Sequence, residues 1–216
     1  MNKLKIKKIG QDVIKLESMA LAKLSKSLDR DFIKAVELIS ELNGKIIISG
    51  VGKSGHIAGK IAASFTSTGI PAIYLNPVDA SHGDMGIIDK NDVLMILSNS
   101  GETHELTDLI NFSKKKKLKI ISITSSNKSL LSKNSDINLI IPYHLEADKL
   151  QTIPTTSTTM SLALGDALCC SVLSLRKFDK KAFRELHPGG KIGKKLKTLN
   201  ETVSYTHLTL PTSYAV

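Results

Sequence analysis

Residues 45–56 constrain the fold of this chain more than any other stretch, because they read as a buried strand, a glycine-rich turn and the start of a helix. The glycines of the turn are Gly50, Gly52 and Gly55. They permit positive φ angles and let main-chain N–H groups approach a ligand closely. The helix adds unpaired N–H groups and the positive end of its dipole, while Ser54 adds a hydroxyl and Lys53 a positive charge. The stretch therefore predicts a turn that binds an anion.

Other interpretations of this turn are a dinucleotide-binding loop, a Walker A loop and a purely structural turn. The dinucleotide pattern requires an acidic residue roughly 20 residues further on, where this chain has Tyr74, Leu75, Asn76 and Pro77. A Walker A loop requires a glycine where Ile47 stands. One isolated glycine pattern leaves the structural turn open, so the anion-binding interpretation depends on a second loop.

A second loop of this kind follows the apolar run at residues 92–98, which predicts another buried strand. Its hydroxyl residues Ser98, Ser100 and Thr103 surround Gly101 just before an amphipathic helix. Hydroxyl and N–H groups at the start of a helix bind phosphate oxygens well. Thr103 alone would suit an ordinary helix cap equally well. The cluster of three hydroxyls therefore predicts the second half of a phosphate site.

Strands alternate with helices along the chain, which predicts a parallel sheet with right-handed crossovers. The predicted strands are the run that begins at Lys45 and residues 72–75, 92–98, 118–124 and 137–141. We expect an α/β fold, a three-layer αβα sandwich with a five-stranded parallel sheet in the flavodoxin-like order 2-1-3-4-5. In this order the first and third strands are neighbours, so one phosphate can touch both loops at the carboxyl edge of the sheet.

Helical periodicity predicts two helices before the sheet, Val13–Leu28 and Phe32–Leu42, which would cover the core or contact another subunit. Residues 76–86 are polar and rich in glycine, which predicts an irregular loop. The last long helix is expected at Thr155–Lys177. Its apolar part, Met160–Leu175, is interrupted by Asp166, and we expect this part to be too short to span a bilayer.

The composition points to one cytoplasmic α/β domain that binds neither nucleic acid nor a membrane. The chain has 216 residues, of which 41% are hydrophobic, and this is enough for a full core. The net charge of +10 comes almost wholly from lysine, but aromatic residues make up only 4% and tryptophan is absent, which is unlike a nucleic-acid surface. No signal peptide is apparent, and the adjacent thiols of Cys169 and Cys170 suit a reducing compartment.

We expect one domain over residues 1–203, with N-terminal helices in residues 1–43 and the α/β core and C-terminal segment in residues 44–203. From residue 204 onward the sequence loses its lysine-rich composition and shows no amphipathic period. Residues 204–216 resemble translated adapter or vector sequence more than native protein. We therefore interpret them as a non-native tail and exclude them from the fold.

Five motifs together resemble the sugar isomerase (SIS) domain of arabinose-5-phosphate isomerases. They are Gly50–His56, Ala80–Asp84, Ser98–Thr103, Gly165–Leu168 and His187–Gly190, in the family's order. The resemblance implies an enzyme that interconverts D-ribulose 5-phosphate and D-arabinose 5-phosphate through an enediol, the first step of Kdo biosynthesis for lipopolysaccharide or capsule. It implies no cofactor and a homo-oligomer, often a tetramer. Full-length members usually append a pair of CBS domains, and their absence from these 216 residues fits a truncated open reading frame or one of the shorter members.

The resemblance also implies the functional residues. The expected catalytic residues are Lys53, Glu105, Glu146 and His187. Lys53 would stabilise the phosphate or the oxyanion. Either Glu105 or Glu146 would move the carbon-bound proton, and His187 would open the sugar ring or serve its oxygens. The expected substrate-binding residues are Gly52, Ser54, His82, Ser98, Ser100 and Thr103.

The remaining question about the histidines is whether any of them binds a metal. His82 and Asp84 could ligate a metal, but a pair without a third ligand is weak support, so no metal is expected. The remaining histidines, His56, His104 and His144, are interpreted as surface or capping residues.

Two other classes of function are alternatives to an isomerase. A non-catalytic SIS module that senses a sugar phosphate stays open, although about 44 residues before the first strand leave little room for a DNA-binding domain. An NAD-dependent enzyme is disfavoured by the missing acidic residue.

Overall fold

The computed structural model describes residues 2–176, 179, 182 and 185–187, and the chain divides into two units, Met1–Lys177 and Phe178–Val216. The first unit holds the whole sheet. The expected non-native tail at residues 204–216 and the expected end of the last helix at Lys177 lie outside the described residues.

The sheet of the first unit has five parallel strands in the order β2-β1-β3-β4-β5, as predicted. The strands are β1 Ile46–Gly50, β2 Ala72–Tyr74, β3 Val93–Leu97, β4 Lys119–Thr124 and β5 Ile137–Ile140. Gly50 at the end of β1 pairs with Leu97 at the end of β3. The two strands therefore finish at the same level, and the loops that follow them start side by side.

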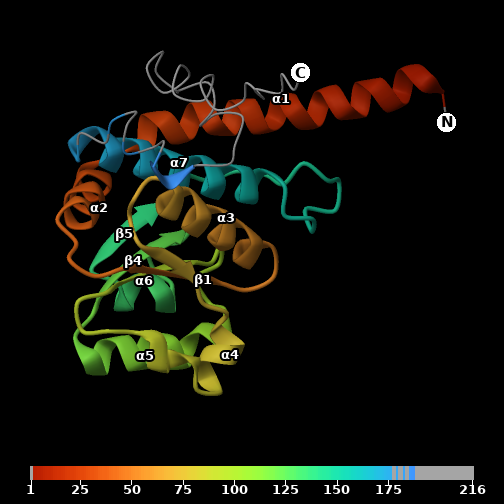
Figure 1. Cartoon of the computed structure of the whole chain (residues 1–216). Helices are drawn as coiled ribbons and strands as arrows, with labels where there is room; N and C mark the ends of the chain where they lie inside the picture. Colours follow the sequence, from red (N-terminus) through yellow and green to blue (C-terminus); the bar gives the residue numbers. More distant parts are fainter. Residues whose placement is uncertain (1, 177–178, 180–181, 183–184, 188–216) are drawn as a thin grey trace, which may run out of the picture. The chain divides into compact units, whose positions relative to one another are not determined.

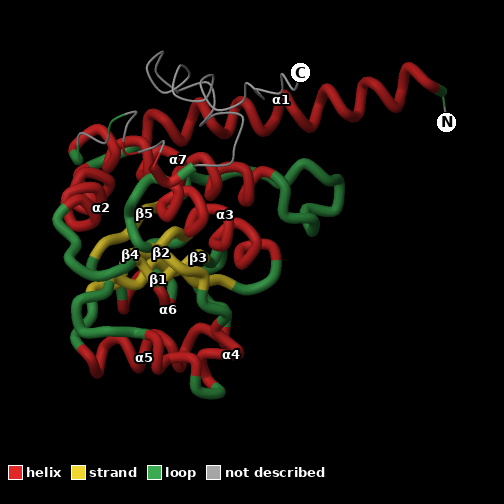
Figure 2. Tube along the Cα trace, viewed as in Figure 1, coloured by secondary structure: helices red, strands yellow, loops and turns green. Residues whose placement is uncertain are grey.

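Helices cover both faces of the sheet, which confirms the three-layer sandwich (Figures 1 and 2). One face carries α1 Lys3–Ser27, α2 Arg30–Ser40, α3 Lys53–Ser67 and α7 Thr156–Leu175. The other carries α4 Pro77–Ser81, η2 His104–Leu106, α5 Thr107–Lys116 and α6 Leu130–Asn134, with the short η1 Asp84–Ile87 beside α4. Alternate residues of a strand point to opposite faces, so Ile46 and Ile48 enter one core and Ile47 enters the other.

The largest differences from the predicted elements lie in the first helix and in residues 76–86, and α2 also starts and ends two residues before the predicted Phe32–Leu42. The first helix begins at Lys3 rather than at Val13, with Asn2 as its N-cap. Only Ala20 and Leu24 of this helix are buried, so Ile6 and Ile9 continue the apolar spacing of the helix without entering the core. Residues 76–86 also contain regular structure, because the Asn76 side chain caps α4 and Pro77 occupies the first turn, where proline is favoured.

Helices α3 and α7 pack closely, and this packing arranges the elements that carry the site. A side chain at Gly165 of α7 would overlap Ile61 Cδ1 of α3 and come within 2.5 Å of Ile61 Cγ1. Lys60 and Asp166 form an ion pair across the same interface. Glycine at position 165 therefore allows the two helices to lie against each other.

Helix α7 also corrects an expectation about its length. It has 20 residues and, among the described residues, is the one helix long and apolar enough to cross a membrane by length and composition. It was therefore wrong to expect it to be too short. Core helices pass the same test, and α7 packs against α1, α2 and α3, with Met160, Leu164 and Leu168 buried.

Candidate functional site

The first glycine-rich turn leads from β1 into α3 with the geometry that its sequence predicts. Gly52 has a φ of 57°, a conformation that favours glycine, and the helix starts at the next residue. A side chain at Gly55 would come within 2.7 Å of both the Gly50 carbonyl oxygen and the Tyr74 hydroxyl. Tyr74 donates a hydrogen bond to that carbonyl at 3.0 Å. The Tyr74 side chain of β2 therefore fixes the turn that carries Lys53 and Ser54.

The second loop folds around the Ser98 side chain. Its hydroxyl accepts a hydrogen bond from the Gly101 N–H at 3.0 Å and lies 2.7 Å from the Thr103 hydroxyl. Ser98 is only 4% exposed, whereas Ser100 is exposed and accepts a hydrogen bond from the Glu102 N–H at 3.2 Å. Ser98 and Thr103 thus hold the shape of the loop, and Ser100 is the hydroxyl of this loop most open to a ligand.

Asn99 lies between the two serines and was missed by the sequence analysis. Its main-chain carbonyl accepts hydrogen bonds from the hydroxyls of Thr124 and Ser125, which fixes the loop on β4. Its side-chain oxygen Oδ1 is buried and has no partner within the part of the chain that the structure describes. Buried polar atoms are normally hydrogen-bonded, so this oxygen marks a place where a ligand or water can bind.

A polar cavity of about 250 Å³ lies between Ser54 of the first turn, Asn99 of the second loop and the segment that runs from Glu146 into α7. Its lining residues are Ser54, Asn99, Glu146, Gln151, Thr152, Pro154, Ser157, Thr158 and Ser161. Ser54 and Glu146 were predicted site residues, and the structure brings them together. The hydroxyls of α7 were not predicted. The signal that could have found them is the run of threonines and serine at residues 155–159, just where this helix begins.

Glu146 is fixed at the start of α7. Its Oε2 atom accepts hydrogen bonds from the Thr155 N–H at 2.8 Å, the Thr155 hydroxyl at 3.1 Å and the Ser157 N–H at 3.2 Å. Burial raises the pKa of Glu146, but the hydrogen bonds from Ser157 and Thr155 outweigh it and hold the pKa below its usual range. The structure therefore presents Glu146 as an ionised carboxylate beside the cavity.

His144 is not the surface residue that the sequence analysis expected. Its side chain is only 7% exposed. Its Nδ1 atom lies 3.0 Å from the Pro142 carbonyl oxygen, and its Nε2 atom lies 3.8 Å from Glu146 Oε1. The sequence spacing of two residues did not by itself indicate this contact, because it depends on the bend of the segment after β5.

The other predicted site residues do not line the cavity. Glu105 lies in η2 and His82 follows α4, and both are exposed. Helix α4 packs against η2 and α5, so the two residues belong to the same side of the sheet. The remaining predicted residues of the first unit outside the cavity lining are Lys53, Gly52, Ser98, Ser100 and Thr103. His187 lies in the second unit, and its role stays a prediction.

No group of three or more His, Cys, Asp or Glu side chains within residues 2–176, 179, 182 and 185–187 is arranged to hold a metal ion. The polar groups of the cavity are instead hydroxyls, amides and one carboxylate. Such groups can hydrogen-bond the hydroxyl and carbonyl groups of a sugar, and the carboxylate can accept a proton.

Comparison with known proteins connects this geometry to a family. The family model described as SIS domain matches residues 38–171. The arabinose 5-phosphate isomerase KdsD of Yersinia pestis is 42% identical over 203 residues, which cover 94% of this chain and 62% of the relative. The arabinose 5-phosphate isomerase KdsD of Francisella tularensis subsp. tularensis is 46% identical over 188 residues, which cover 86% of this chain and 58% of the relative. This chain therefore spans less than two thirds of the length of these curated relatives.

One solved structure matches over nearly the same region. The structure of E. coli CFT073 c3406 in complex with arabinose 5-phosphate has a TM-score of 0.84 and is 36% identical in sequence. The match covers 87% of this chain and 100% of that chain.

Proposed function

The chain belongs to the SIS domain family, and from that premise we propose that it is an aldose–ketose isomerase that interconverts D-ribulose 5-phosphate and D-arabinose 5-phosphate. The observation that carries the proposal is the cavity in which Ser54, Asn99 and Glu146 meet. The names of the two KdsD relatives and the arabinose 5-phosphate complex of c3406 support the choice of substrate.

The proposed reaction moves a proton between C1 and C2 of the sugar. A base removes the carbon-bound proton, the C–H electron pair forms the C1–C2 double bond, and the carbonyl π pair moves to its oxygen, which takes a proton to give the enediol. The hydroxyl on the other carbon then gives up its proton and becomes the new carbonyl, as the enediol double bond takes the proton back from the base at the neighbouring carbon. Hydrogen-bond donors or a positive charge must stabilise the oxygen on which charge develops. The cavity supports this chemistry because a carboxylate stands beside hydroxyl and amide groups.

We assign the phosphate to the two glycine-containing turns. The start of α3 offers Gly52, Ser54 and unpaired main-chain N–H groups. The second loop offers Ser100 directly, while Ser98 and Thr103 hold its shape. The paired ends of β1 and β3 support one phosphate in contact with both turns.

The positive charge in this proposal comes from Lys53. The side chain is exposed at the first residue of α3, and no carboxylate forms an ion pair with it among the described residues. Its ammonium is therefore free to approach a phosphate or an oxyanion. We retain His82 as a substrate contact and His187 as the residue that opens the ring or serves the sugar oxygens.

Two glutamates compete for the role of base. Glu146 lines the cavity, whereas Glu105 is exposed on η2 outside it. We therefore favour Glu146. In the cell we propose a cytoplasmic enzyme at the first step of Kdo biosynthesis, acting as one SIS domain over residues 1–203.

The test is to incubate the purified protein with ribulose 5-phosphate in deuterated water and follow the sugar by NMR. We expect arabinose 5-phosphate to form, with deuterium at C2 in the fraction of turnovers in which the proton on the base exchanges with solvent before it returns. If the folded protein binds ribulose 5-phosphate in calorimetry but forms no arabinose 5-phosphate and exchanges no carbon-bound proton, the alternative of a non-catalytic sugar-phosphate-binding module is correct. A protein that neither binds nor converts the sugar would contradict both proposals.

We also propose that the chain forms a homo-oligomer, with a tetramer as the expected state, and that α1 contributes to the contact. The residues Ile6, Ile9, Val13, Leu16, Ala20 and Leu24 recur at intervals of three or four and share one face of α1. Ala20 and Leu24 are buried in the core, but Ile6 is 53% and Ile9 is 47% exposed. A second copy of α1 would cover the exposed half of this stripe.

This proposal predicts a change of assembly when the stripe is charged. Replacing Ile6 and Ile9 together by glutamate should shift the protein to a smaller species in sedimentation velocity, because two carboxylates would be buried in the contact. Lys3→Gln with Lys7→Gln changes the net charge equally while leaving the apolar stripe whole, and it should leave the assembly intact. An unchanged sedimentation coefficient for the glutamate variant would remove α1 from the contact.

A further inference from the structure

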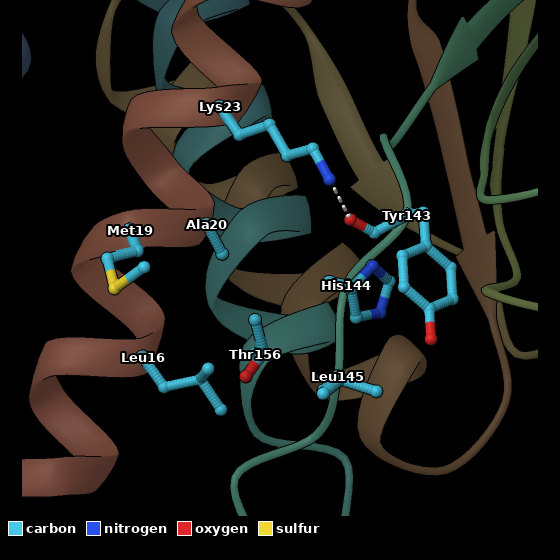
Figure 3. Close-up of a pocket in the computed structure, with 8 residues that line it drawn as sticks. All are labelled: Leu16, Met19, Ala20, Lys23, Tyr143, His144, Leu145 and Thr156. Atoms are coloured by element: carbon cyan, nitrogen blue, oxygen red, sulfur yellow. Dashed lines mark hydrogen bonds between the residues drawn. The ribbon is translucent and has the colours of Figure 1, made fainter.

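A second cavity, of about 220 Å³, lies between α1 and the segment that follows β5 (Figure 3). Lys23 of α1 donates a hydrogen bond from Nζ to the Tyr143 carbonyl oxygen at 2.8 Å, and its ammonium lies 5.7 Å from the centre of the Tyr143 ring. Helix α1 thus anchors this segment. His144 connects the two cavities, because it lines this one and contacts Glu146 of the other.

The His144 ring is fixed by its first nitrogen. A carbonyl oxygen can only accept a hydrogen bond, so the 3.0 Å contact with the Pro142 carbonyl oxygen requires the proton on Nδ1. In the neutral ring the other nitrogen, Nε2, then carries a lone pair. That nitrogen faces Glu146 Oε1 at 3.8 Å.

The two oxygens of Glu146 have different surroundings. Oε2 accepts hydrogen bonds from the Thr155 N–H, the Thr155 hydroxyl and the Ser157 N–H, and the Ser157 hydroxyl is a fourth donor to the carboxylate. Oε1 is the oxygen that faces Nε2 of His144, and we assign it the proton from the substrate. Donors at Oε2 favour the ionised form and weaken the carboxylate as a base, whereas a neutral nitrogen that accepts a hydrogen bond from a protonated Oε1 favours the neutral form.

We propose that His144 is a positioning residue for Glu146 and that its Nε2 accepts a hydrogen bond from Oε1 of Glu146 once that oxygen carries the sugar's proton, which holds the protonated carboxyl in place. This inference rests on the proposed function of Glu146 as the base. The proton that leaves C1 or C2 sits on Oε1, is shared with Nε2 while the enediol exists, and returns to the neighbouring carbon. The charged groups that face the ring are Glu146 and, from α1, Lys23.

Two amide substitutions test the contacts of the two His144 ring nitrogens one at a time. His144→Asn can keep a donor near the position of Nδ1 for the Pro142 carbonyl but cannot reach Oε1. His144→Gln can place its amide near the position of Nε2 and gives up the Pro142 contact. We expect His144→Asn to lower kcat by about 10- to 100-fold with KM changed less than about threefold, and His144→Gln to retain most of the kcat.

The opposite order of the two variants, or equal losses in both, would assign His144 a purely structural role and overturn the inference. Unchanged kcat in His144→Asn would overturn it too. In a Glu146→Gln background, His144→Asn should cause no further loss of kcat, because the interaction that it removes is already absent.

A second readout does not depend on activity. In ¹⁵N NMR of the histidine rings, Glu146→Gln should shift the Nε2 resonance of His144 and leave Nδ1 as a hydrogen-bonded donor. A stationary Nε2 resonance would show that the two side chains do not interact, whatever the enzyme does. If Nε2 moves while the unaltered protein lacks isomerase activity, the proposed function fails and the contact between His144 and Glu146 stands.

Discussion

Replacing Glu146 by glutamine should lower kcat for the interconversion of ribulose 5-phosphate and arabinose 5-phosphate by about 10²- to 10⁴-fold, the range for loss of a general base. Glutamine keeps the length and an oxygen acceptor for the Thr155 and Ser157 N–H groups but cannot take a proton from carbon. We expect KM to change little, because the phosphate is assigned to the two turns. Steady-state kinetics and deuterium exchange at C2 measure the effect.

Glu105→Gln is the matched control. Glu105 is exposed on η2 and does not line the cavity, so we expect a much smaller loss of exchange. If Glu105→Gln loses more exchange than Glu146→Gln, the roles are reversed and Glu105 is the base. If neither substitution affects exchange, the acid–base assignment of both residues is wrong.

The same Glu146→Gln variant should also change the dependence of stability on pH. Hydrogen bonds at the start of α7 hold the pKa of Glu146 below its usual value of 4.5. A carboxylate with a lowered pKa stabilises the fold above its unfolded pKa, and this stabilisation is lost as the pH falls through the folded pKa. At pH 7 the variant should be less stable by about 0.5–1 kcal/mol, because it keeps the acceptor but loses the negative charge at the start of α7, and the difference in stability should disappear as the pH falls below 4.5.

The sheet could be predicted because its signals are local. Each strand is a short apolar run that ends at glycine, proline or hydroxyl residues, and the alternation with helices leaves few topologies for a parallel sheet. The turn at Gly52 could be predicted as well, because the conformation with positive φ needs glycine there. The start of α1 was missed although Ile6 and Ile9 continue the spacing that begins the predicted helix at Val13, because lysines surround these exposed residues.

The site was less predictable because its contacts join distant parts of the chain. Ser54 followed from the turn itself, whereas Glu146 came only from the family resemblance. The partners of Glu146 stand nine and eleven residues further along the chain, and no periodic pattern links them. Asn99 was missed because its distinguishing property is a buried oxygen without a described partner, and a sequence does not show burial of one atom. The cap of α4 was readable from Asn76 and Pro77.

The second turn yields the prediction with the largest expected effect on stability. Gly101 has a φ of 72°, and a side chain there would overlap Ser129 Oγ and come within 2.5 Å of Ser129 Cβ. Ser129 cannot move away easily, because its hydroxyl caps α6 and the Leu131 N–H donates to the Gly101 carbonyl at 3.0 Å. Gly101→Ala should therefore lower the free energy of unfolding by about 2–5 kcal/mol, combining backbone strain with overpacking.

Alanine substitutions at two other glycines, measured by urea denaturation, separate the effect of backbone strain from the effect of overpacking. Gly52 also has a positive φ but open space around it, so Gly52→Ala should lose only the strain, about 1–2 kcal/mol. Gly86 has open space and no positive φ, so Gly86→Ala should change stability by less than about 1 kcal/mol. Equal losses of unfolding free energy in Gly101→Ala and Gly52→Ala would show that Ser129 moves aside and that overpacking contributes nothing. A larger loss at Gly101, with weaker binding of ribulose 5-phosphate by the folded variant, would show that α6 holds the second turn in the shape that binds phosphate.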